Sequence, residues 1–131
     1  MADDQVQMRG LRQVALPATD VERAVGFYRD VLGLRHVATY GDLAFFDLDG
    51  VRLLVERNES EARSDAYVLY LTVDDIDAAW AALRDRGVAF VDEPHLIFPD
   101  QAGTFGPAGE EEWMAFFHDS EGNLLALSTR R

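Results

Sequence analysis

Few side chains in this 131-residue chain could carry out chemistry, and their types already exclude several mechanisms. The sequence has three histidines, His36, His95 and His118, and no two of them have the spacing of two or four residues that favours a shared metal ion. It has no cysteine, and all twelve basic residues are arginines because lysine is absent. Thiolate catalysis, cysteine-bound zinc, Schiff-base chemistry and a P-loop lysine are therefore excluded.

Three of the remaining polar side chains are candidates for catalysis. Glu56 ends an apolar strand-like run and would act as a general base if it faces a cavity, whereas a register shift of one residue would make it an ordinary surface carboxylate. His118 precedes a turn and would be either an acid–base group at the rim of the cavity or a solvent-exposed histidine paired with Asp119. The amide of Gln13 could orient a ligand carbonyl.

His95 leads into the longest loop-like segment, which is rich in glycine and proline over residues 99–109. Loop residues often carry function, so His95 either lines the cavity or is simply solvated. Phe98 and Phe105 lie beside and within this segment, and its glycines would let it move as a lid over a ligand.

The chain contains an internal repeat that fixes its organisation. The segment DVERAVGFYRD, which starts at Asp20, aligns with DIDAAWAALRD, which starts at Asp75, at an offset of 55 residues. Both segments place apolar residues at helical spacing. Thr19 and Glu22 form a capping-box pattern for the first helix, and Asp74 or Asp75 can cap the second.

Strand-like runs surround both helical segments in the same order. One run precedes each helix and three follow it, so the sequence predicts the order βαβββ twice. We expect an α+β fold in which two βαβββ modules form a curved mixed sheet that encloses a concave cleft. Residues 1–9 are expected to be disordered, and residues 10–131 to form one domain with repeats at residues 10–57 and residues 66–131.

The alternation of side chains along each strand predicts which residues face the cleft. The apolar residues Leu16 and Leu71 should pack under the helices, so that Gln13 and Tyr70 point the opposite way. The residues of the last two strands that share one face are Met114, Phe116, His118, Leu124 and Ala126. Together they predict an apolar cleft for a planar or acyl ligand, with Gln13 and Glu56 as its polar anchors.

The composition limits the partners and the location of the protein. A net charge of -12 would repel nucleic acid and anionic membrane surfaces. The sequence has no run of 18 apolar residues, and its start, MADDQVQMRG, lacks a basic region followed by an apolar one. We therefore expect a cytoplasmic protein with no nucleic-acid or membrane partner.

Two stretches, VALPATDVERAVGFYRDVLGL and DSEGNLLAL, resemble the vicinal oxygen chelate superfamily. This superfamily includes glyoxalases, bleomycin-resistance proteins, extradiol dioxygenases and methylmalonyl-CoA epimerases. The resemblance covers roughly residues 11–129 and implies the paired βαβββ fold and a homodimer.

The resemblance also implies four positions at which metal-using relatives hold a divalent ion. In this chain those positions carry Gln13, Glu56, Val68 and Ala126, and only the first two have donor atoms. Since zinc sites typically use about three or four protein ligands, we expect no metal and no other cofactor. If a divalent metal does bind, Gln13 and Glu56 would be among its ligands, with a histidine (His36, His95 or His118) entering from elsewhere.

Two classes of function remain open. The first is metal-independent binding of a small apolar or aromatic ligand, with contacts from Gln13, Tyr70, His95, Met114, Phe116, Leu124 and Ala126. The alternative is a lyase or isomerase of the glyoxalase or epimerase type, either metal-dependent or using Glu56 as base, with Gln13 and His118 as its other catalytic groups. Extradiol dioxygenase activity is disfavoured, because its iron needs two histidines and a carboxylate and the aligned positions supply only the carboxylate.

Overall fold

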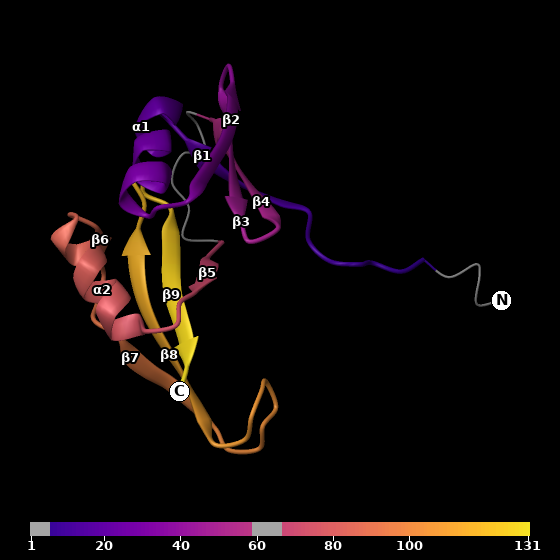
Figure 1. The fold of residues 1–131 in the computed structure, drawn as a ribbon, viewed down its shortest axis with the longest axis vertical. Helices are drawn as coiled ribbons and strands as arrows, with labels where there is room; N and C mark the ends of the chain where they lie inside the picture. Colours follow the sequence, from indigo (N-terminus) through magenta and orange to yellow (C-terminus); the bar gives the residue numbers. More distant parts are fainter. Residues whose placement is uncertain (1–5, 59–66) are drawn as a thin grey trace.

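The computed structural model describes residues 6–58 and 67–131, which form two sheets, each with a helix on one face (Figure 1). Sheet A has the strand order β1-β4-β3-β2. Its strands are β1 (Gln13–Ala18), β2 (Arg35–Tyr40), β3 (Leu43–Leu48) and β4 (Val51–Arg57). Strand β1 pairs with β4 in parallel, and the other pairings are antiparallel.

Sheet B repeats this arrangement with the order β5-β9-β8-β6, and β7 also pairs with β8. Its strands are β5 (Leu69–Thr72), β6 (Ala89–Phe90), β7 (His95–Asp100), β8 (Glu110–His118) and β9 (Leu124–Arg130). The expected α+β fold with two βαβββ modules is confirmed. The expected disorder of residues 1–9 falls largely on residues outside the described ranges, as does the linker at residues 59–66.

The first of the three strand-like runs that follow the second helical segment, VAFVDEPHLIF at residues 88–98, is divided into β6 and β7. The division occurs at Asp92, whose carboxylate accepts a hydrogen bond from the Phe116 amide at 3.1 Å. The carbonyl oxygen of Asp92 also accepts a hydrogen bond from the Trp80 indole at 3.2 Å. These bonds to other parts of the chain replace the regular ladder, and Pro94, which follows, has no amide hydrogen to restore it.

The helices begin at aspartates. Helix α1 (Val21–Val25) continues as the π-helical turn η2 (Gly26–Val31), and Asp20 caps it by accepting from the Arg23 amide at 3.0 Å. The capping box predicted for Thr19 and Glu22 is wrong, because Asp20 is the N-cap and the Thr19 hydroxyl donates to Glu121 instead. Helix α2 (Ile76–Asp85) is capped by Asp75, as predicted.

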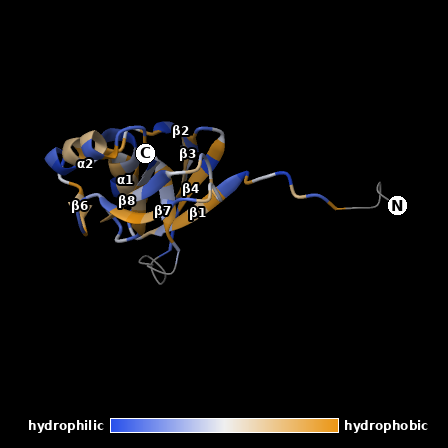
Figure 2. Ribbon diagram, turned by 90° about the horizontal axis from the view of Figure 1, so that it is seen from below, coloured by the Kyte–Doolittle hydropathy of each residue, from blue (hydrophilic) through white to orange (hydrophobic). Residues whose placement is uncertain are grey.

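A single hydrophobic core lies on the helix side of both sheets. It includes Phe46 and Leu53 from sheet A, and Phe117 and Leu125 from sheet B, all fully buried. Figure 2 shows hydrophilic and hydrophobic residues alternating around α2, as expected for a helix that packs one face on this core. Within the described residues, no helix is long and apolar enough to cross a membrane.

Polar contacts tie the turn between β8 and β9 to the first half of the chain. The carboxylate of Glu121 accepts hydrogen bonds from the Thr19 and Asp20 amides at 3.1 and 3.0 Å and from two nitrogens of Arg23 at 2.8 and 2.9 Å. The Tyr28 hydroxyl donates to Asp119 at 2.5 Å. We call this set the latch: Thr19, Asp20, Arg23 and Tyr28 from the first half, and Asp119, Glu121 and Asn123 from the second.

The latch changes the ionisation of two of its members. Burial pushes the pKa of Glu121 upward, but hydrogen bonds from Arg23, the Asp20 amide and nearby hydroxyls outweigh it and lower that pKa from 4.5 to about 2. Burial, together with the adjacent Asp119 charge, raises the pKa of Tyr28 well above its usual value. Glu121 is therefore held ionised and Tyr28 protonated.

Candidate ligand-binding site

The face of each sheet opposite its helix carries no helix among the described residues, and we call it the open face (Figure 1). On sheet B the strand register aligns Tyr70 with Ala126 and Ala126 with Phe116, so the three side chains share this face. Met114, aligned with Ser128, and His118, aligned with Leu124, extend it along β8. The register therefore brings together residues that the sequence proposed for one cleft.

Aromatic rings form a continuous row across the open face of sheet B. The rings of Tyr70 and Phe116 lie 6.3 Å apart at an interplanar angle of 80°, in edge-to-face contact. The ring of His95 lies 6.2 Å from Phe116 at 30°. Tyr70 is 55% exposed, so this row of His95, Phe116 and Tyr70, which we call the aromatic row, presents apolar surface to solvent.

His95 is held in place by its own loop. Its Nδ1 lies 3.1 Å from the carbonyl oxygen of Glu93 and 3.5 Å from a carboxylate oxygen of Asp92. Two acceptors at Nδ1 favour the tautomer with its proton there, which makes Nε2 the acceptor nitrogen. Since Asp92 also binds the amide of Phe116, one carboxylate positions both rings.

Gln13 and Glu56 both lie on the open face of sheet A, but they are not neighbours. Gln13 is aligned with Arg52, whose Nε donates to the Gln13 side-chain oxygen at 2.6 Å. Glu56 is aligned with Pro17, four residues further along the strands, which corresponds to about 13 Å. The prediction that Gln13 and Glu56 could hold one ion is therefore wrong.

The repeat identifies the position that truly corresponds to Ala126. Ala126 is aligned with Tyr70, and the residue 55 positions before Tyr70 is Ala15, which is aligned with Leu54. The equivalent of Ala126 is therefore Leu54, and assigning Glu56 to that position is wrong by two residues. The alternation of side chains cannot reveal this error, because a residue shifted by two positions along a strand still faces the same side of the sheet.

A divalent metal, which some members of the resembled superfamily use, does not fit the side chains at these positions. Of the four residues there, Gln13, Leu54, Val68 and Ala126, Gln13 alone has a donor atom. His36 lies on the helix side of sheet A, with its Nε2 2.7 Å from the Thr39 hydroxyl and its ring beside Phe46. Within residues 6–58 and 67–131, no three histidine or carboxylate side chains cluster closely enough to hold a metal ion.

The loop that follows β7 is fastened at its base. Asp100, only 3% exposed, accepts hydrogen bonds from the amides of Thr104 and Phe105 and from Arg130, at 2.8 to 2.9 Å. The Phe105 amide is the main cause of the lowered pKa of Asp100, and burial acts against it. Phe105 itself is 70% exposed and touches Phe98, with ring centroids 5.7 Å apart. The sequence analysis missed the part that Arg130 plays here, although Arg130 and Glu112 have the parity of cross-strand neighbours.

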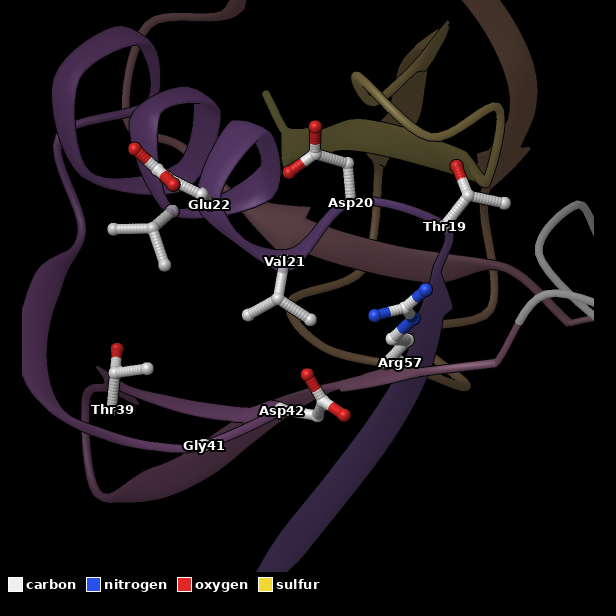
Figure 3. Close-up of a pocket in the computed structure, with 9 residues that line it drawn as sticks. Thr19, Asp20, Val21, Glu22, Thr39, Gly41, Asp42 and Arg57 are labelled. Carbon is white, nitrogen blue, oxygen red and sulfur yellow. The ribbon is translucent and has the colours of Figure 1, made fainter.

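Two of the surface cavities border the sheets and the helix α1, and neither was predicted. The first, of about 580 Å³, lies between the start of α1 and the turn after β2. Figure 3 shows Asp42, in the turn after β2, and Arg57, at the end of β4, across this cavity from the first turn of α1, so the cavity lies on the helix side and has both polar and apolar lining residues. The second, of about 400 Å³, lies between the turn after β3 and strand β5, and we call it the seam cavity.

Comparisons with known proteins agree with this architecture. The family model described as Glyoxalase/Bleomycin resistance protein/Dioxygenase superfamily matches residues 10–127. A glyoxylase-like domain-containing protein from Didymella fabae is 31% identical over 132 residues, covering 89% of this chain and 91% of the relative.

Solved structures give the same result at the level of the fold. A glyoxalase/bleomycin resistance protein/dioxygenase from Alicyclobacillus acidocaldarius has a TM-score of 0.69 at 23% identity, covering 91% of this chain and 89% of that one. A lactoylglutathione lyase from Agrobacterium tumefaciens has a TM-score of 0.67 at 23% identity, covering 91% and 92%. The match over residues 10–127 shows that this chain belongs to the Glyoxalase/Bleomycin resistance protein/Dioxygenase superfamily, the vicinal oxygen chelate family that its sequence resembles.

Proposed function

We propose that this protein binds a small aromatic or apolar organic ligand on the open face of sheet B, without a metal ion. The observation that carries this proposal is the aromatic row, in which Phe116 is flanked by Tyr70 and His95 while Tyr70 stays 55% exposed. An aromatic pair contributes about 0.5–1.5 kcal/mol beyond the burial of area, so two flanking rings favour a planar ligand.

Polar groups beside the row would orient such a ligand. Thr72 and Ser128 are aligned with each other on the same face. Their hydroxyls lie two residues further along the strands than Tyr70 and Ala126. His95 adds an acceptor nitrogen, because its Nδ1 is engaged by the loop. A few polar groups around an apolar surface are the usual composition of a small-molecule site.

The lyase activity in the name of the Agrobacterium tumefaciens structure is not inferred for this chain. Lyase activity is a property of that protein, and likeness at 23% identity concerns the fold. The separation of Gln13 from Glu56 also removes the pair of oxygen ligands that would favour metal-dependent chemistry. Binding is therefore the function that the geometry supports best.

The test is a thermal-shift screen of small aromatic compounds, with hits confirmed by ligand-observed NMR in the presence and absence of EDTA. We expect binding that EDTA does not change and that Phe116→Ala weakens by about tenfold, since the central ring of the row is removed. The matched control is Phe45→Ala, which truncates the equivalent ring on sheet A. Loss of binding in EDTA, equal weakening by both variants, or no stabilisation by any compound would contradict the proposal.

A further inference from the structure

Two of the hairpin turns, the one after β3 and the one after β8, occupy equivalent positions but have different surroundings. Phe46 is aligned with Leu53, and Phe117 with Leu125, so the turn after β3 corresponds to the turn after β8. The turn after β8 is fastened to the first half by the latch. The turn after β3 approaches β5 without any such set of bonds among the described residues, and the seam cavity lies there instead.

The lining of the seam cavity is mostly aliphatic. Val14 and Leu48 come from the first half, and Leu69 and Leu71 from the second. These side chains are on the helix side of their sheets, at the edge of the core, and they are only partly buried. A volume of about 400 Å³ lies within the range of small-molecule sites, at roughly 300–1,000 Å³. The cavity can therefore hold a hydrocarbon group of moderate size.

Tyr70 connects this cavity to the aromatic row. It lines the seam cavity and also makes the edge-to-face contact with Phe116. Strand β5 is the edge strand of sheet B, so the open face and the helix side of this sheet meet around it at Tyr70. A ligand that reaches from the aromatic row to the cavity would pass over Tyr70 at this edge.

Among residues 6–58 and 67–131, a single charged residue lines the seam cavity. Asp49 stands at the turn after β3, beside aliphatic residues and the threonine of β5, and the described lining residues include no cation. The backbone of Asp49 has φ of 50°, a conformation that asparagine also adopts readily. A carboxylate at the edge of an apolar cavity, in a chain of net charge -12, favours a cationic group over an anionic one.

We propose that the ligand is a hydrophobic aromatic amine: its ring stacks on the aromatic row, its hydrocarbon body fills the seam cavity, and its ammonium group pairs with Asp49. This inference rests on the proposed function and names the chemical class of the ligand. A neutral ligand of the same shape fills the cavity equally well but leaves Asp49 without its counter-charge.

The probes are 4-phenylbutylamine and 4-phenylbutan-1-ol, which share one skeleton and differ in charge. Dissociation constants come from ligand-observed NMR at low ionic strength, where charge pairing is least screened. We expect the amine to bind at least about fivefold more tightly than the alcohol, and Asp49→Asn to remove this preference. Val14→Phe, which fills the cavity, should weaken both probes by about tenfold.

Controls separate this inference from the proposed function. Melting temperatures establish that each variant folds, and Leu48→Phe fills the cavity from the opposite wall if Val14→Phe does not fold. If Phe116→Ala weakens binding while Asp49→Asn and the filling variants do not, ligands bind on the aromatic row alone and the inference is wrong. If aromatic compounds stabilise the protein but the amine shows no advantage over the alcohol, the class of ligand is wrong although the proposed function stands.

Discussion

The open faces of sheets A and B are built on the same backbone but present different chemistry. Gln13, Arg52 and Asp47 on sheet A correspond to Val68, Leu124 and His118 on sheet B. On sheet A the guanidinium of Arg52 stands over the ring of Phe45, 5.8 Å from its centroid. On sheet B the equivalent ring, Phe116, meets other rings instead. The two halves share the strand register, but two of these three positions are apolar on sheet B and all three are polar on sheet A.

The second difference between the halves lies at the hairpin turns. The turn after β8 places Asp119 and Asn123 where the turn after β3 has Leu48 and Val51. At the first location Asp119 accepts from Tyr28 and Asn123 donates to the Pro17 carbonyl oxygen, whereas at the second the aliphatic side chains border a cavity. The turn after β8 is therefore fastened by hydrogen bonds, whereas the equivalent turn after β3 borders the seam cavity.

The largest expected effect tests this contrast between the turns. Glu121→Ala should lower the free energy of unfolding by about 3 kcal/mol, because it removes several charge-assisted hydrogen bonds from a buried site. Asp49→Asn at the equivalent turn should change it by less than about 0.5 kcal/mol, as for most surface substitutions. Urea unfolding of both variants gives the values. Equal losses of unfolding free energy at the two turns would contradict the stabilising contribution that we assign to the latch.

Acid titration sharpens the same contrast with a somewhat smaller effect. The pKa of Glu121 is about 2 in the folded protein, against an ordinary value of 4.5, so its contribution is complete above pH 4.5 and is lost as the pH falls towards 2. The unfolded chain takes up the proton first, and the loss over this window should be about 2 kcal/mol. Because other carboxylates titrate here, the measurement is the difference between wild type and Glu121→Gln. A pH-independent difference would contradict the lowered pKa.

The smallest expected effect addresses the open faces. Leu124→Arg gives sheet B the cation that stands over the ring on sheet A, and it should weaken binding of aromatic compounds by about tenfold, or about 1.4 kcal/mol. The reciprocal variant, Arg52→Leu, removes an exposed hydrogen bond to Gln13 and should alter stability by less than about 0.5 kcal/mol. Binding that survives Leu124→Arg unchanged would place the ligand elsewhere.

Much of the fold could be predicted because the chain repeats its own pattern. The offset of 55 residues from Asp20 to Asp75 located both helices, and both aspartates are N-caps. Alternation along the strands placed Tyr70 and Phe116 on one face, as the register shows. These signals are local, so a single sequence carries them.

The failures involve contacts between distant residues. Glu121 and Arg23 are separated by 98 residues, and nothing local distinguishes Glu121 from any other acidic residue in a turn. The break at Asp92 depends on bonds to Trp80 and Phe116, which neighbouring sequence does not reveal. The misplacement of Glu56 arose because strand alternation fixes the face of a residue but not its distance along the sheet.

The latch has a consequence for the independence of the two repeats. Glu121 accepts from three residues of the first half, and the buried Asn123 donates to the Pro17 carbonyl oxygen at 2.9 Å. A second half expressed by itself would expose Glu121 to water without the arginine and amides that bind it, and a first half by itself would expose Tyr28 without its acceptor Asp119. Each half therefore lacks, by itself, the polar partners that its own side chains use in the whole chain, so we expect either half expressed alone to be less stable than the whole.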